Sequence, residues 1–398
     1  MAGRQNNAIE VVCGSLGVFR HVRRRHGDRT DFALVSALSD AVVAAHLLYI
    51  VYMLGALVGL LFMGRLADSQ GFRPVMLFGL ALGWGGTLLS MLSWDLGALG
   101  AARFAVGLSS SLIVTSASVG LMQVLRTRSP QYASTLTSFL LAFGFGLGPI
   151  SGGLTAQWLP QPLVTTYIPT LLLGVLAIYG LLKVHTNEPG AAAAFRWQAL
   201  APRLTWPERR DTFAFVLTCC CPFFAFGVFG LYASMSPLFI DKMLPWHGPA
   251  VSGCSIGVIL MMSAAVQLLS VRLSLHWCGS LGLLAVVLSN ALLVFNFQAM
   301  SVALFAVGVL AAAVGHGLCL LAGISMVNRI ASPAQRAGLI STYLVSGYVG
   351  SIAPLLGAGW LADHFGLQAA ITALGLGVVA TALPAGVAFL RHPRMRND

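Results

Sequence analysis

Among the side chains within the long apolar segments of this chain that can carry a charge, an arginine and a histidine are candidates for a functional role. Arg103 stands near the start of the segment 97–124, and His316 lies within the segment 300–327. A charge inside a membrane is costly unless it faces a partner or a wet cavity, so Arg103 is a candidate for contacting an anionic group or a transferred proton. Histidine changes its charge near neutral pH, which makes His316 a candidate proton-binding residue. The alternatives are that Arg103 extends to the membrane surface and that His316 is a hydrogen-bonded packing residue.

Other polar residues in the apolar segments are candidates for lining a cavity: Ser110, Tyr232 and Gln267. Ser110 belongs to a row of serines and threonines that either line a cavity or bond back to the preceding helical turn. No Asp or Glu lies near the middle of any apolar segment between 41 and 390. A mostly apolar interior of this kind favours lipophilic ligands.

Catalytic and metal sites are not indicated by the sequence. It contains no glycine-rich phosphate loop with a lysine, no acidic pair and no nucleophile beside a base. We therefore expect neither an enzyme nor an ATP-driven pump, and no cofactor. The seven cysteines lack the spacing of metal ligands, so we expect free buried thiols and no metal site.

Composition identifies the elements that must position these residues. Of 398 residues, 57% are hydrophobic and only 9% are charged, whereas soluble domains contain about 25% charged residues. Hydrocarbon offers no partners for backbone N–H and C=O groups, so apolar runs of about 20 residues predict membrane-spanning helices. Eleven such segments are clear: 41–63, 74–93, 97–124, 133–157, 163–184, 212–240, 250–271, 279–297, 300–327, 337–361 and 368–390.

The net charge of +11 comes mainly from arginines in alternate short loops between these segments. This bias is typical of cytoplasmic loops and does not indicate nucleic-acid binding. It predicts a multi-pass protein of the plasma (inner) membrane, with the loop 64–73 and the C-terminus in the cytoplasm.

The polar stretch 185–211 has the prolines and charges of a linker and predicts two bundles, 41–184 and 212–398. The similar peptides LRTRSPQYASTLTSF and NRIASPAQRAGLISTY, one in each part, indicate related halves. Residues 1–40 carry an arginine cluster that should not span a membrane. We interpret them as a degenerate or missing first helix; the alternatives are a natural eleven-helix chain and a first helix shielded by protein. The cluster could also hold anionic lipid headgroups.

A short charged hairpin, GRLADSQGFR, joins the first two apolar segments. Its main residues are Gly64, Asp68, Gly71 and Arg73. Gly71 is expected to form the turn, where a positive φ would be costly for other residues. The alternative is an ordinary turn that carries the charge of a cytoplasmic loop.

A second motif, GFGLGPISGG, places three glycines four residues apart on one helix face: Gly144, Gly148 and Gly152. This strip predicts close packing against a neighbouring helix. Pro149 is expected to bend the helix because it removes a backbone hydrogen bond, and Gly153 completes the run.

These motifs resemble those of the major facilitator superfamily of transporters. The hairpin at 64–73 is similar to the family's loop between its second and third helices. The run Gly-x-x-x-Gly-Pro-x-x-Gly-Gly at 144–153 looks like the fifth-helix motif of its antiporter branches, especially drug efflux. Arg103-x-x-x-Gly107 resembles a fourth-helix element in which the arginine is linked to proton transfer or to an anionic substrate.

The resemblance covers about residues 40–390 and implies an all-α membrane protein with two pseudo-symmetric six-helix bundles, alternating access and a monomeric state. In the family the hairpin braces the second helix against the eleventh; here Ser69 and Phe72 replace residues that are usually basic. The predicted function is proton-coupled efflux of small lipophilic molecules. The alternatives are uptake of a small metabolite and a non-transporting or inactive remnant.

Overall fold

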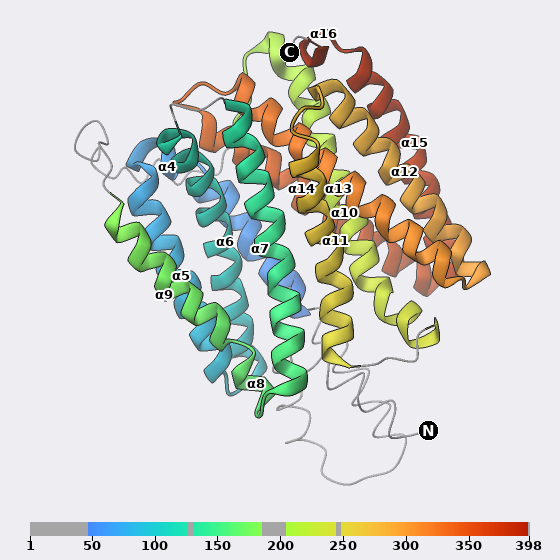
Figure 1. Ribbon diagram of the computed structural model, residues 1–398, viewed down its shortest axis with the longest axis horizontal. Helices are drawn as coiled ribbons and strands as arrows, with labels where there is room; N and C mark the ends of the chain where they lie inside the picture. The colour runs from blue at the N-terminus through green and yellow to red at the C-terminus, as the bar shows by residue number, and fades with distance from the viewer. Residues whose placement is uncertain (1–46, 126–129, 185–203, 244–247, 397–398) are drawn as a thin grey trace. The chain divides into compact units, whose positions relative to one another are not determined.

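The computed structural model describes residues 47–125, 130–184, 204–243 and 248–396. Every regular element among these residues is a helix, and none of them forms a strand (Figure 1). The predicted all-α fold is therefore confirmed. The predictions for residues 1–40, and for the linker before residue 204, lie outside the described residues.

Ten helices are long and apolar enough to cross a membrane, and a shorter apolar helix, Leu47–Met63, precedes them. Together they coincide with the eleven predicted segments. The ten spans are formed by α5 (Phe72–Leu92), α6 (Leu96–Val124), α7 (Pro130–Trp158), α8 with α9 (Pro162–Thr165 and Ile168–Lys183), α10 (Thr212–Met243), α11 (Pro249–Leu269), α12 (Leu275–Ala299), α13 (Val302–Ile330), α14 (Arg336–Phe365) and α15 (Leu367–Arg391).

Two of the predicted segments are interrupted. The helix Leu47–Met63 ends in a single π-helical stretch, η1 (Gly59–Met63). The segment predicted at 163–184 is divided into α8 and α9, with Pro169 at the start of α9. Proline has no N–H and fixes its own φ, so it is tolerated at a helix start but not easily inside one.

The chain falls into two compact units. The first unit contains the described residues of Met1–Ser116, Leu147–Leu200 and Pro245–Ser255. In this unit α5 packs along α9, and the indole N–H of Trp84 donates a 3.2 Å hydrogen bond to the carbonyl of Leu171.

The second unit contains the described residues of Ala117–Gly146, Ala201–Leu244 and Ile256–Asp398. Its central helix is α13, which packs against both α12 and α10 (Figure 1). The residues of α13 are buried along most of its second half. α10 also packs along α14, and α12 along α15. This packing holds His316, on α13, in the interior of the unit.

The start of α10 is anchored by the residues just before it. The backbone N–H of Thr205 donates to the hydroxyl of Thr342 on α14 at 2.9 Å, and that hydroxyl donates back to the carbonyl of Thr205 at 3.0 Å. The ring of Trp206 packs edge-on against Phe215 of α10, with 5.9 Å between centroids. The chain therefore enters the second unit along a fixed path.

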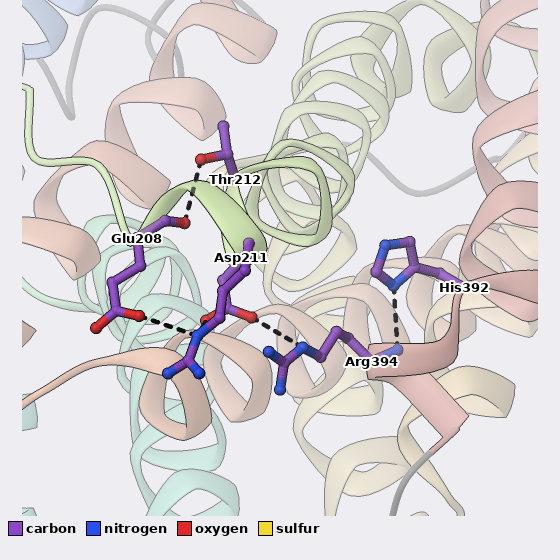
Figure 2. Close-up of polar contacts among 6 residues, drawn as sticks. Glu208, Asp211, Thr212, His392 and Arg394 are labelled. Carbon is purple, nitrogen blue, oxygen red and sulfur yellow. Dashed lines mark hydrogen bonds and ion pairs between the residues drawn. The ribbon is translucent and has the colours of Figure 1, made fainter.

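A second anchor, which we call the C-terminal clasp, joins η3 (Arg209–Asp211) to the short helix α16 (Pro393–Arg396). Figure 2 shows the Arg394 side chain reaching Asp211, with 3.0 Å between Nε and Oδ1. The Asp211 side chain is only 10% exposed, and Met395 is fully buried in the core of the unit. The clasp thus combines a shielded ion pair with an apolar anchor.

Replacing Arg394 with glutamine should destabilise the second unit. The mutation removes one of the two cations paired with a nearly buried carboxylate and leaves Arg210, whose Nε lies 3.6 Å from Oδ2 of Asp211. Oδ1 loses its partner, and an unsatisfied buried group costs about 1–3 kcal/mol. We expect the thermal unfolding midpoint of the detergent-purified protein to fall by a few degrees. Arg396→Gln is the matched control, because Arg396 is exposed on the same short helix. Equal midpoints for the two variants would contradict the importance of the ion pair.

Candidate functional site

Three polar side chains meet in the interior of the second unit, and we call them the buried triad: Ser263, Gln267 and His316. His316 is 3% exposed and the other two are fully buried. The hydroxyl oxygen of Ser263 lies 2.8 Å from Nδ1 of His316. The amide nitrogen of Gln267 donates to the same hydroxyl at 3.3 Å. The triad therefore links α11 to α13 through one shared oxygen atom.

Helix geometry explains how the triad forms. Ser263 and Gln267 are four residues apart on α11, so they lie one above the other on the same face. Beside His316 on α13 stands Gly317, where an added Cβ would lie 2.6 Å from the carbonyl oxygen of Ser263. The absence of a side chain at Gly317 lets the two helices approach closely enough for His316 to reach Ser263.

Aromatic rings surround the imidazole of His316. Phe226 of α10 stacks on it with 6.0 Å between centroids, and Phe229 lies tilted at the same distance. Phe226 in turn packs edge-on against Tyr348 of α14. A group that can bind a proton is thus held among apolar rings, with a neutral hydroxyl as its hydrogen-bond partner.

The structure brings together two of the residues predicted from the sequence, His316 and Gln267, through a third that was not predicted. Ser263 could have been found from its position one helical turn before Gln267. Tyr232 is not part of the triad. Its hydroxyl donates to the carbonyl of Ser289 on α12 at 3.0 Å, and its ring lies against Phe305.

Arg103 belongs to the first unit. Its Nη2 donates to the phenol oxygen of Tyr167, at the junction of α8 and α9, over 3.4 Å. Tyr167 is 8% exposed, so the guanidinium is held beside a largely buried hydroxyl. Gly107, one turn further along α6, lies directly against the backbone of Tyr52.

Several hydroxyls in the row on α6 bond back to the preceding helical turn, which is one of the two alternatives for this row, but Ser110 is not among them. Ser110 accepts a hydrogen bond from the phenol of Tyr52 at 3.4 Å. Three of its neighbours donate instead to carbonyls of the preceding turn, which is the common behaviour of such residues inside helices. These are Ser109, Ser111 and Thr115.

The hairpin at 64–73 has the predicted turn. Gly71 has φ 83° and ψ 157° between α4 (Leu66–Gln70) and α5, a conformation that a side chain would strain. Arg73 donates from Nη2 to the carbonyl of Leu182, in the last turn of α9, at 2.9 Å. A cation is favourable at this end of a helix. Gly64 is buried and Asp68 is half-buried.

The glycine strip of α7 requires a correction. Around Gly144, Gly148 and Gly152, no described residue lies within 4 Å of the position that a Cβ would occupy. The close contact with α11 is made at Gly153, where an added Cβ would lie 2.6 Å from the carbonyl oxygen of Pro249. Successive helical residues point about 100° apart, so the packed face is turned away from the predicted strip.

On α11 the partner of this face is Gly253. A Cβ there would clash with the carbonyl oxygen of Pro149 and lie 3.0 Å from Cα of Gly153. Pro149 lies inside α7, and it presents its carbonyl to α11 at this point. Gly153 and Gly253 thus allow backbone-to-backbone contact between the two helices.

Comparisons with known proteins agree with this architecture. The model of the Major Facilitator Superfamily matches residues 31–279. The structure is similar to that of the human organic anion transporter MFSD10 (TETRAN), with 16% identity, coverage of 95% of this chain and 98% of that chain, and a TM-score of 0.67. It is also similar to the proton:xylose symporter XylE bound to 6-bromo-6-deoxy-D-glucose, with 14% identity, coverage of 97% and 92%, and a TM-score of 0.66.

A search of curated protein sequences gives no match. At identities this low the two solved structures establish the fold alone, whereas the family model covers more than half of the chain. The motifs, the ten spanning helices and the family match together place this chain in the major facilitator superfamily, as a multi-pass membrane transporter.

Proposed function

We propose that this protein is a secondary active transporter that works by alternating access and exports small lipophilic molecules in exchange for protons. The observation that carries the proposal is the buried triad. An imidazole hydrogen-bonded to a hydroxyl can take up and release a proton, and the rings of Phe226 and Phe229 around it are apolar. One of the two similar solved structures is itself named as a proton symporter.

Export is favoured over uptake by the α7 motif. Its sequence resembles that of the family's antiporter branches, and its helix approaches α11 closely at Gly153 and Gly253. Uptake of a small metabolite is the second candidate. Arg103 beside Tyr167 favours it, because a guanidinium inside a span can hold an anionic group. A non-transporting remnant is the third, on account of the arginine cluster in residues 1–40.

The alternate-loop arginines support a plasma (inner) membrane location with the hairpin 64–73 and the C-terminus in the cytoplasm. The proposed partners are a small-molecule substrate, protons and membrane lipid, and the proposed working unit is a monomer made of bundles 41–184 and 212–398.

Transport into oriented membrane vesicles tests the proposal. Inside-out vesicles with an acidic lumen should accumulate a neutral lipophilic dye that carries one hydroxyl group, and a protonophore should abolish the accumulation. A neutral dye avoids the passive trapping that an acidic lumen imposes on amines. Gradient-driven uptake only into right-side-out vesicles would support the second candidate, and transport in neither orientation would support the third.

Asp68→Asn should reduce transport by about tenfold at equal membrane abundance, because it removes the negative charge that the family's hairpin uses in its charge and helix-end contacts, and a hydrogen bond to a charged group contributes about 1.5–3 kcal/mol. Asp68 lies half-buried on α4, at the position where the family's hairpin carries its acidic residue. The dye assay above provides the measurement. Ser69→Ala is the matched control, since Ser69 is exposed on the same short helix. Unchanged transport by Asp68→Asn would remove the hairpin from the mechanism.

A further inference from the structure

The hydroxyl of Ser263 is the shared atom of the buried triad, and its single proton restricts the arrangement. A hydroxyl donates one hydrogen bond and accepts two. Gln267 donates to it through Nε2. When Nδ1 of His316 carries no proton, the Ser263 hydroxyl can donate to that nitrogen across 2.8 Å. Nε2 of Gln267, the hydroxyl of Ser263 and Nδ1 of His316 then form a chain of two hydrogen bonds, in which Gln267 donates to Ser263 and Ser263 donates to His316.

A proton on Nδ1 reverses this direction. The imidazolium must donate at both nitrogens, so Ser263 becomes the acceptor of His316 and its own proton needs another partner. The amide nitrogen of Gln267 cannot accept it. The direction of hydrogen bonds that suits the neutral imidazole therefore leaves the proton of Ser263 in need of a new acceptor when the imidazole is protonated.

Gln267 contains the group that can resolve this conflict. Its side-chain oxygen Oε1 is buried and accepts no hydrogen bond from any described residue. A half-turn of the amide about its last side-chain bond exchanges Nε2 for Oε1 at Ser263. Ser263 could then accept from His316 and donate to Oε1. The hydrogen bonds from Gln267 to Ser263 and from Ser263 to His316 can thus be replaced by bonds of the opposite direction when His316 takes up a proton, and Oε1 is paired only in that state.

The groups that face His316 are neutral. They are Ser263 from α11 and the rings of Phe226 and Phe229 from α10. On α14 the titratable residue nearest to these rings is Tyr348, which touches Phe226. The contacts of His316 with other helices are thus with uncharged side chains, and the Ser263–Gln267 pair is the polar group placed to respond to its proton.

We propose that Gln267 is the substrate-recognition residue of this transporter, and that a proton on His316 and a hydrogen-bond donor on the substrate compete for its Oε1. This inference rests on the proposed proton coupling at His316. With His316 neutral, Oε1 is an unpaired acceptor, available to a hydroxyl or N–H group on a lipophilic molecule once the cycle opens the triad. With His316 protonated, Ser263 occupies Oε1. Uptake of a proton therefore releases the substrate, as antiport requires.

Equilibrium binding to the full chain in nanodiscs tests the competition, with 1-pyrenemethanol and its methyl ether as probes and empty nanodiscs as the blank. The two probes differ only in the hydrogen-bond donor. We expect the alcohol to bind about tenfold or more tightly than the ether at high pH, and this preference to vanish at low pH. We also expect binding of the alcohol, but not of the ether, to release protons into a weakly buffered solution.

Variants then assign the effect to residues. Gln267→Leu and Gln267→Met should bind both probes equally at every pH, and Ser263→Ala should keep the preference for the alcohol but lose its pH dependence. Asn290→Leu is the control, because it removes a buried amide from α12 of the same unit. It should behave like the unmodified chain.

Failure of this inference can be distinguished from failure of the proposed function. If dye transport is proton-driven and depends on His316, but both Gln267 variants retain the preference for the alcohol, the role of Gln267 is overturned and proton coupling stands. If the dye still accumulates against its own gradient without a proton gradient and without His316, the proposed function itself is wrong. Equal binding of the two probes to the unmodified chain would also overturn the inference.

Discussion

His316→Asn should abolish proton-driven accumulation of the dye while downhill exchange of the dye across the membrane continues. Asparagine can still hydrogen-bond to Ser263, so the contact between α11 and α13 is conserved. It cannot titrate, and the apolar segments between 41 and 390 have no Asp or Glu near their middles to replace it. Positioned proton-transfer groups typically contribute about 100-fold or more to the rates of the steps that they serve.

The measurement is the initial rate of dye accumulation in inside-out vesicles across a range of lumenal pH. His364→Asn is the matched control, because His364 is exposed near the end of α14, where its Nδ1 lies 2.8 Å from the carbonyl of Trp360. A His316→Asn variant that retained gradient-driven accumulation with the same pH response would show that the proton is carried elsewhere. Arg103 would then be the next residue to test.

Gly253→Leu should prevent the correct assembly of α7 with α11. At this position even a Cβ would meet the carbonyl oxygen of Pro149 and the Cα of Gly153. These are backbone atoms, so no side-chain rotation can relieve the clash. Overpacking of a core costs about 1–3 kcal/mol where side chains can shift, and we expect a larger loss here. Folded protein should fall to a small fraction of the normal amount.

Size-exclusion chromatography of a fluorescent fusion, at matched expression, measures this effect. Gly152→Leu is the control, because it adds the same side chain to α7 at a position where no described residue lies within 4 Å of a Cβ. We expect a monodisperse peak for Gly152→Leu and aggregated or absent protein for Gly253→Leu. Equal profiles for the two variants would contradict the close packing at Gly253.

The helices of this protein could be predicted because hydrocarbon imposes a simple requirement on sequence. Every span must be apolar for about 20 residues, so the described part of each of the eleven predicted segments is helical, with 163–184 divided into α8 and α9. The turn at Gly71 could also be predicted, because its positive φ depends on local backbone sterics and not on distant neighbours.

The packed face of α7 could not be predicted in the same way. Glycines occur both on the strip that contains Gly148 and on the face that contains Gly153. The choice between them depends on where α11 lies, which the sequence of α7 does not encode. Ser263 was missed for a related reason. Serines inside helices commonly bond to their own backbone, and only the proximity of His316 on α13 gives this one a different partner.

The C-terminal clasp determines where this chain can be shortened or extended without harm. A purification tag or reporter that replaces the residues after Arg391 would remove Met395, which is fully buried, and Arg394, one of the two cations that pair with Asp211. The same tag attached beyond Arg396, which is exposed, leaves both contacts in place. If a fusion made directly after Arg391 gives no signal, the cause is therefore the loss of the contacts that Met395 and Arg394 make beside the start of α10. Such a result does not show that the natural protein is absent from the membrane.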